Sequence, residues 1–132
     1  MSHCQTPAPP TRPGVDALIT FFYYKDFDRA VRFYGETMGF ELTVDQGWSK
    51  IFRVTGNAHM GVVDEKRGYH KANAIKPVEL TLVVGDADAW YAYLTAQGVP
   101  TLNTPHDVPE LALRLFLLQD PEGYVIEIQQ FL

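Results

Sequence analysis

The chain has 132 residues, of which 46% are hydrophobic and 20% are charged, and its formal net charge at pH 7 is -5. This length suits one domain with its own hydrophobic core, and the composition is that of a soluble globular protein. The acidic balance argues against a nucleic-acid partner, since there is no basic stripe to neutralise phosphates. No apolar run approaches the roughly 20 residues that cross a bilayer, so no membrane partner is expected.

The N-terminal residues 1–14 are rich in proline and are interpreted as an arm that precedes the folded domain, residues 15–132. Cys4 in this arm is the single cysteine of the chain. One cysteine provides neither a disulfide framework nor a thiolate metal site, which fits the reducing cytoplasm.

The first half of the folded domain predicts a strand, a helix and three more strands. Residues 17–24 are rich in aromatic and β-branched residues, which favours a strand buried on both faces. Asp26 is a plausible N-cap, and apolar residues then recur at helical spacing until Gly39. Short strands are expected over residues 40–44, 49–54 and 59–63. The polar residues 64–76 are typical of a linker.

The second half repeats this pattern. Residues 78–84 predict a strand, and Asp86 is expected to be an N-cap, one repeat of 60 residues after Asp26. The helix that follows ends before Gly98. Each half therefore predicts a strand, a helix and then two or three strands, a βαβββ unit whose helix covers one face of a sheet. We place module 1 at about residues 15–64 and module 2 at about residues 77–132.

A hairpin is predicted to close the chain. Asp120-Pro121-Glu122-Gly123 has the residues of a type I turn, with an apolar run on each side. In the second run, alternation places Ile126 and Ile128 on one face and Glu127 on the other. An unpaired carboxylate is costly to bury, so Glu127 either faces water or lies in a functional pocket. Glu127 is therefore the first candidate for a functional residue.

The repeat, the segment Asp26-Phe-Asp-Arg-Ala-Val-Arg-Phe-Tyr34 and the Asp120-Pro-Glu-Gly123 turn before Ile126-Glu127 resemble the vicinal oxygen chelate superfamily. That superfamily includes glyoxalase I, extradiol dioxygenases and bleomycin-binding proteins. The resemblance implies an α+β fold, in which two βαβββ modules form a cupped sheet with helices on the outer face, completed in a homodimer. One fold hosts many reactions, so the resemblance specifies the fold more closely than the function.

The resemblance also implies four metal-ligand positions, one in each opening strand and one in each later strand. Matching the motifs places Ile19 at the first position, His59 near the second, Glu79 at the third and Glu127 at the fourth. Isoleucine cannot coordinate a metal, so the four-ligand site is not carried over intact. His59, Glu79 and Glu127 would still suit a divalent ion such as Zn²⁺, Ni²⁺, Fe²⁺ or Mn²⁺.

Alternation within the strands predicts which side chains share a cleft with Glu127. Glu79 and Thr81 lie on one face of their strand, and Phe21 and Tyr23 have the same parity in the first strand. We expect Glu127 and Glu79 to be catalytic. The residues expected to bind a ligand are Phe21, Tyr23, Trp48, Phe52 and Thr81. For each single aromatic the alternative is core packing, and each glutamate could instead bond a neighbouring tyrosine or amide. Arg114 in a later strand is interpreted as a salt-bridge residue at the sheet margin.

Two functions follow from these residues. In the first, a divalent ion polarises vicinal oxygens of a small substrate, as in lyases, isomerases or dioxygenases of glyoxalase type. In the second, the protein is a metal-free small-molecule binder or antibiotic-resistance protein that resembles the bleomycin-binding proteins. Retention of Glu79 and Glu127 favours the first, and Ile19 favours the second. Without a metal the two carboxylates should repel, which would raise the pKa of one of them.

Overall fold

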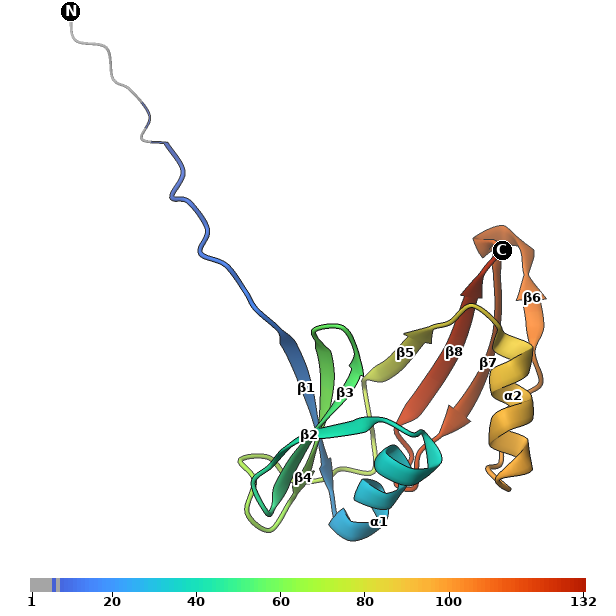
Figure 1. Cartoon of the computed structure of the whole chain (residues 1–132), viewed down its shortest axis with the longest axis horizontal. Helices are drawn as coiled ribbons and strands as arrows, with labels where there is room; N and C mark the ends of the chain where they lie inside the picture. Colours follow the sequence, from blue (N-terminus) through green and yellow to red (C-terminus); the bar gives the residue numbers. More distant parts are fainter. Residues whose placement is uncertain (1–5, 7) are drawn as a thin grey trace, which may run out of the picture.

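The computed structural model of the protein describes residue 6 and residues 8–132, so Cys4 of the expected arm lies outside the described residues. These described residues form two four-stranded sheets (Figure 1). The strands of the first sheet, in the order β1-β4-β3-β2, are β1 (Leu18–Tyr24), β2 (Glu41–Asp45), β3 (Ser49–Thr55) and β4 (Ala58–Asp64). Those of the second, in the order β5-β8-β7-β6, are β5 (Glu79–Val83), β6 (His106–Val108), β7 (Leu113–Gln119) and β8 (Val125–Phe131). The opening strand of each module is parallel to the last strand, and the other pairs are antiparallel.

One helix accompanies each sheet. Helix α1 (Phe27–Arg32) continues into a π-helical turn, η1 (Phe33–Thr37), whereas α2 (Ala87–Ala96) is regular. A short 3-10 helix, η2 (Pro109–Leu111), precedes β7. Both expected N-caps are confirmed: Asp26 accepts a hydrogen bond from the backbone N–H of Arg29, and Asp86 accepts one from that of Ala89. The expected α+β fold of two βαβββ units is confirmed as well.

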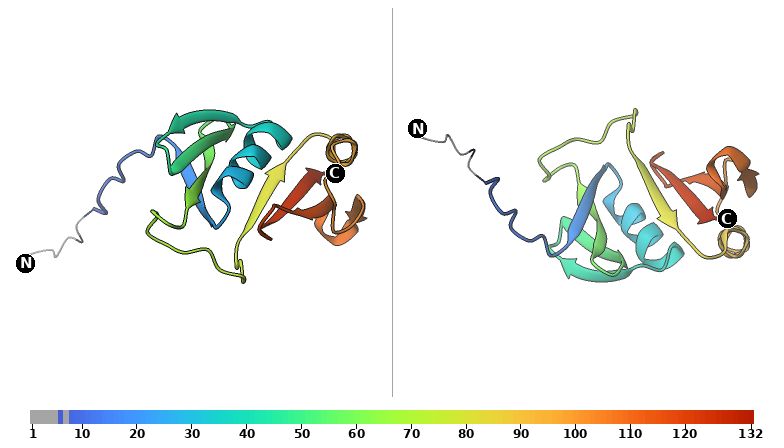
Figure 2. Two further views of the ribbon diagram at one scale, coloured as in Figure 1. Left: turned by 90° about the horizontal axis from the view of Figure 1, so that it is seen from below. Right: turned by 90° about the horizontal axis from the view of Figure 1, so that it is seen from above.

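A single hydrophobic core joins the two modules on the helix-facing sides of the sheets. Phe22 and Tyr24 of β1 belong to the same buried cluster as Ile126 and Ile128 of β8. Figure 2 shows α1 lying between the two sheets. The prediction that the first strand is buried on both faces was wrong, because Phe21 on its other face is 39% exposed. Each sheet thus has one face in the core and one open face.

The closing hairpin docks module 2 onto module 1 through a buried carboxylate. Gly123 donates a backbone hydrogen bond of 3.1 Å to the Asp120 carbonyl, which confirms the turn. Asp120 Oδ2 accepts hydrogen bonds from the hydroxyls of Tyr24 (2.5 Å) and Tyr34 (2.8 Å). Burial raises the pKa of both tyrosines, so these hydroxyls keep their protons and remain donors. The ring of Tyr124 stacks on Phe22, with 4.4 Å between centroids, which adds an apolar contact beside the polar one.

Candidate functional site

The open face of the second sheet brings Glu79 and Glu127 together. In the parallel pair of β5 and β8, Thr81 is opposite Glu127 and Glu79 is opposite Val125, so the two glutamates are diagonal neighbours. Thr81 Oγ1 donates a 3.2 Å hydrogen bond to Glu79 Oε2. Partial burial raises the pKa of Glu127, and hydrogen bonding and repulsion from Glu79 raise it further. The pair therefore shares a proton more readily than two independent carboxylates would.

Aliphatic side chains from the next strand explain the burial of Glu127. In the antiparallel pair of β7 and β8, Leu117 is opposite Glu127 and Leu115 is opposite Gln129, so both leucines lie on the same face as the carboxylate. Both are half-buried. The carboxylate of Glu127 is consequently flanked by apolar surface on the β7 side and by Glu79 and Thr81 on the β5 side.

The open face of the first sheet carries the other candidate residues of module 1. His59 of β4 is opposite Ile19 of β1, and its Nδ1 lies 3.2 Å from the backbone carbonyl of Asn57. Phe21 is opposite Gly61, and a Cβ built on Gly61 would lie only 2.3 Å from Cδ1 of Phe21. The Phe21 ring thus lies directly on the glycine backbone. Sequence reasoning did not identify Gly61, because an isolated glycine in a strand gives no hint of which ring covers it.

Residues 64–76, which were interpreted as a linker, pack on this face at Tyr23. The His70 ring meets the Tyr23 ring edge-on with 5.1 Å between centroids. A Cβ on Gly68 would lie 2.9 Å from Cε1 of Tyr23, so the segment approaches the ring closely. Tyr23 is therefore half covered by its own chain, which limits how much of it a ligand can contact.

The two remaining aromatic candidates occupy different environments. Trp48 is 39% exposed, and the Arg67 guanidinium lies over its ring at 5.7 Å from the centroid. Phe52 is only 1% exposed and belongs to the core. Phe52 thus supports the sheet from the helix side and cannot contact a ligand on the open face, whereas Trp48 remains accessible.

Each chain by itself supplies only part of the expected metal-ligand set. Glu79 and Glu127 lie on the second sheet, whereas His59 lies on the first. Among residue 6 and residues 8–132, no group of three or more histidine, cysteine or acidic side chains could hold an ion. Two carboxylates alone are an incomplete set, since divalent transition ions take at least three protein ligands in open sites. Any such centre would need a further ligand that the described residues of one chain do not bring to this pair.

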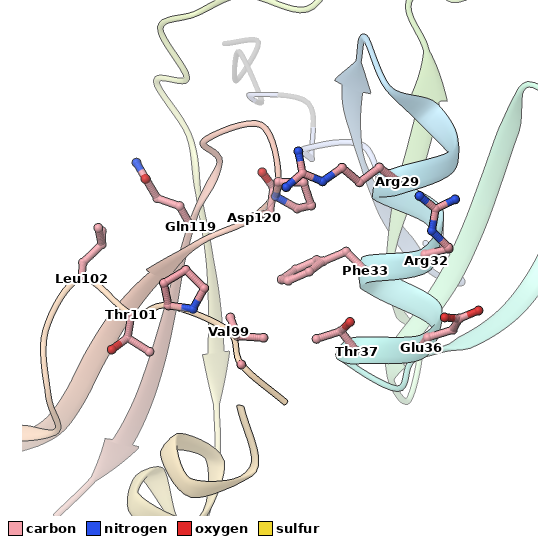
Figure 3. Close-up of a pocket in the computed structure, with 13 residues that line it drawn as sticks. Arg29, Arg32, Phe33, Glu36, Thr37, Val99, Thr101, Leu102, Gln119 and Asp120 are labelled. Carbon is pink, nitrogen blue, oxygen red and sulfur yellow. The ribbon is translucent and has the colours of Figure 1, made fainter. Parts of the chain in front are cut away.

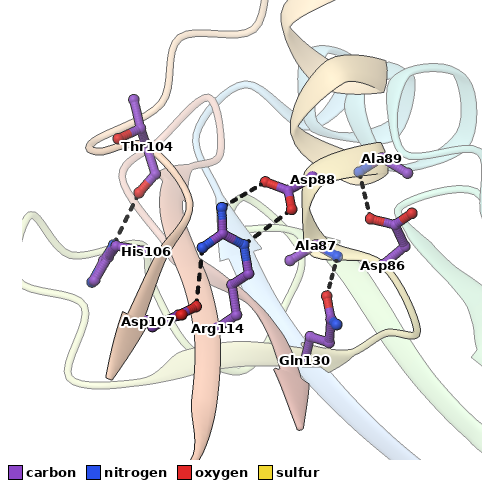
Figure 4. A network of polar contacts seen from close by, with 9 residues as sticks. All are labelled: Asp86, Ala87, Asp88, Ala89, Thr104, His106, Asp107, Arg114 and Gln130. Carbon is purple, nitrogen blue, oxygen red and sulfur yellow. Dashed lines mark hydrogen bonds and ion pairs between the residues drawn. The ribbon is translucent and has the colours of Figure 1, made fainter. Parts of the chain in front are cut away.

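Arg114 has a structural role, in agreement with its interpretation as a salt-bridge residue. Its guanidinium donates to both carboxylate oxygens of Asp88 in α2, at 2.9 and 3.0 Å, and to Asp107 of β6 at 3.0 Å (Figure 4). The hydrogen bonds from Arg114 lower the pKa of Asp88. The strand β6 was not predicted, because its three residues have no periodic signal and are defined by pairing with β7. Arg114 thus links α2, β6 and β7 at the sheet margin.

A family model described as the Glyoxalase/Bleomycin resistance protein/Dioxygenase superfamily matches residues 15–128. The chain belongs to this family, as the sequence resemblance predicted. Its reaction is not specified by that membership, because the family name itself joins glyoxalases, bleomycin resistance proteins and dioxygenases.

Solved structures support the same fold. A lactoylglutathione lyase from Agrobacterium tumefaciens is 20% identical with a TM-score of 0.71, and the match covers 90% of this chain and 96% of that one. TioX from Micromonospora sp. ML1 is 25% identical with a TM-score of 0.73, covering 88% and 98%. A superfamily member from Sphaerobacter thermophilus DSM 20745 is 19% identical with a TM-score of 0.73, covering 86% and 95%. No curated protein matches the chain. Within the described residues, no helix has the length and apolarity needed to cross a membrane.

Proposed function

We propose that the protein is a glyoxalase-type enzyme that binds a small substrate with adjacent oxygen atoms against the Glu79–Glu127 pair. The observation that carries this proposal is the juxtaposition of the two carboxylates on an open sheet face, with the pKa of Glu127 raised. A carboxylate whose pKa is raised holds a proton closer to neutral pH and is a better general acid or base there. Glu127 would move the proton, and Glu79, held by Thr81, would orient it.

We further propose that a second copy of the chain closes the site. The open faces expose apolar side chains that a monomer would leave in water, including Ile19 at 40%, Phe21 at 39% and Val83 at 62%. A two-fold homodimer that places the first sheet of one copy over the second sheet of the other would cover both faces at once. It would also supply His59 as a third group beside the two glutamates.

A divalent ion fits this donor set only when that third ligand is added. Two carboxylates and one imidazole are ligands that Zn²⁺, Ni²⁺, Fe²⁺ and Mn²⁺ accept, with positions left for substrate oxygens. Such an ion would supply Lewis acidity towards the substrate oxygens. Leu115 and Leu117 would exclude water from the Glu127 side of the site, which strengthens electrostatic interactions there.

The test is the metal content of protein purified without chelator, followed by titration with each of the four ions. Glu127→Gln and Glu79→Gln should each lower metal content strongly while the fold, followed by circular dichroism, is kept. Glu110→Gln is the matched control, because Glu110 is exposed in η2. A Glu127→Gln protein that keeps its full metal content and turnover would contradict the proposal. Turnover would be screened with 2-oxoaldehyde thiol adducts, acyl-CoA epimers and catechols.

A second candidate is a metal-free protein that sequesters a flat, cationic compound. The Ile19–His59 pair favours it, because isoleucine stands at a ligand position and the His59 ring is already engaged with the Asn57 carbonyl. In that case Glu79 and Glu127 would neutralise the cation, and Phe21 and Trp48 would stack on it. Absence of metal under all conditions, with saturable binding of bleomycin or a flat cationic dye in calorimetry, would favour this candidate over the enzyme.

A further inference from the structure

A second cleft lies between the modules, away from the Glu79–Glu127 pair. It has a volume of about 610 Å³ and opens between helix α1 with η1, residues 98–102 and the end of β7. Figure 3 shows that its lining comes from both modules, with Phe33 pointing into the space from one side and Leu102 and Gln119 on the other. Neither glutamate of the proposed site lines this cleft. The cleft is therefore a separate feature of the surface.

Two arginines stand at the rim of the cleft. Arg29 and Arg32 are three residues apart along α1, a spacing that places both side chains on one face of the helix. Neither forms an ion pair with any residue that the structure describes. By contrast, Arg53 and Arg114 are each paired with carboxylates. The rim thus holds two guanidiniums that no carboxylate among the described residues pairs with.

The two carboxylates in the lining do not neutralise these arginines. Asp120 is 5% exposed, and its oxygens already accept four hydrogen bonds, from two tyrosine hydroxyls and two backbone N–H groups. Glu36 is four residues after Arg32, but Figure 3 shows their charged groups pointing apart. A guanidinium binds a carboxylate or phosphate through parallel N–H donors. In Figure 3 the Arg29 guanidinium reaches across the cleft towards Asp120 and can bind an oxyanion there, whereas the Arg32 guanidinium points in another direction and adds positive charge at the rim.

The floor of the cleft is apolar. Phe33 is 9% exposed and belongs to the core cluster, and Val99 packs against that cluster. Pro100 and Leu102 continue this surface on the module 2 side, and the Thr101 side chain adds a polar group between them. An aromatic or short aliphatic body fits such a floor, since pockets for small molecules combine apolar walls with a few polar groups.

We propose that this cleft binds an organic anion: a carboxylate or phosphate head on Arg29, favoured by the positive charge of Arg32 at the rim, with an apolar body on Phe33 and Val99. The cleft spans the junction of the modules, so its ligand would contact both of them at once. The proposal does not depend on the function of the Glu79–Glu127 pair, and its failure would leave that assignment unchanged.

The test is calorimetry and amide NMR with three naphthalene probes, namely 1-naphthyl phosphate, 1-naphthoate and the uncharged 1-naphthol. Each guanidinium contact to a charged group is expected to contribute about tenfold in affinity. The double variant Arg29→Gln with Arg32→Gln should therefore bind the two anionic probes much more weakly and keep its affinity for 1-naphthol. The control variant Arg12→Gln with Lys66→Gln removes the same amount of charge outside the cleft and should leave the affinity for all three probes unchanged. The phosphate and carboxylate probes, compared directly, identify which head group is preferred.

A second pair of variants tests the location without removing an arginine. Leu102→Glu introduces a carboxylate at a 54% exposed lining position and should weaken the binding of the anionic probes. Leu111→Glu is the control, at a 61% exposed position outside the cleft. The proposal is overturned if 1-naphthol binds as tightly as the anions, if the double arginine variant keeps wild-type affinity, or if the NMR shifts fall on β5 and β8.

Discussion

Replacing Tyr34 by phenylalanine tests whether the Asp120 carboxylate holds the two modules together. Tyr34 is fully buried, and its hydroxyl donates to Asp120 Oδ2 at 2.8 Å. The Tyr24 hydroxyl has a single proton and lies 2.5 Å from the same oxygen, compared with 3.2 Å from the Tyr34 oxygen. It therefore donates to Asp120 as well. Tyr34→Phe removes one of the two hydroxyl donors and leaves the ring in place.

The expected cost follows from the charge and burial of this hydrogen bond. A hydrogen bond to a charged group contributes about 1.5–3 kcal/mol, so the free energy of unfolding should fall by that amount. For a chain of this size the melting temperature should fall by roughly 6–12 °C, since about 4 °C corresponds to each kcal/mol. The measurement is urea unfolding followed by tryptophan fluorescence, with the change taken from the transition midpoint at constant slope.

Tyr93→Phe is the matched control for this measurement. Its hydroxyl also crosses between the modules, donating to the Thr37 carbonyl at 2.9 Å, but Tyr93 is 44% exposed and the acceptor is neutral. That variant should lose about 1 kcal/mol or less. A double-mutant cycle with Asp120→Asn should show strong coupling to Tyr34→Phe. If Tyr34→Phe costs no more than Tyr93→Phe, or if the cycle is additive, the carboxylate does not join the modules as argued.

Two further predictions concern the open faces. In chelator, the Glu127 carboxyl should titrate by NMR above its ordinary pKa of 4.5, and Glu79→Gln should lower that midpoint. Because the pKa of Glu127 is higher in the folded state, Glu127 ionises in the unfolded chain at a lower pH than in the folded protein. The free energy of unfolding should therefore fall as the pH rises from 4.5 through the folded-state pKa of Glu127. Glu127→Gln should abolish that part of the pH dependence. Gly61→Ala should displace the Phe21 ring and cost about 1 kcal/mol in urea unfolding, the low end for overpacking because the ring is partly exposed. Gly85→Ala, where a Cβ meets nothing within 4 Å, should cost less, and equal costs would contradict the contact.

Local sequence signals were sufficient for the two α-helices and for the strands other than β6. The two aspartate N-caps and the positive φ of Gly39 (76°) and Gly98 (75°) mark helix ends that depend on single residues, so they could be read from residue type alone. The alternation in β8 likewise specified that Ile126 enters the core and Glu127 does not. Such features are set within a few residues, and the 60-residue repeat then related one module to the other.

Only the tertiary structure decided how these elements meet. The exposure of Phe21 and the burial of Phe52 depend on which face of the first sheet packs against the helix. Both strands carry apolar residues on both faces, so their sequences alone do not specify which face that is. The contacts of Asp120 with Tyr24 and Tyr34 join positions 96 and 86 residues apart, and no local pattern encodes such pairs. The sequence by itself thus determined the two modules and the carboxylate pair. The docking of the modules, and with it the separation of His59 from that pair within one chain, is a property of long-range packing.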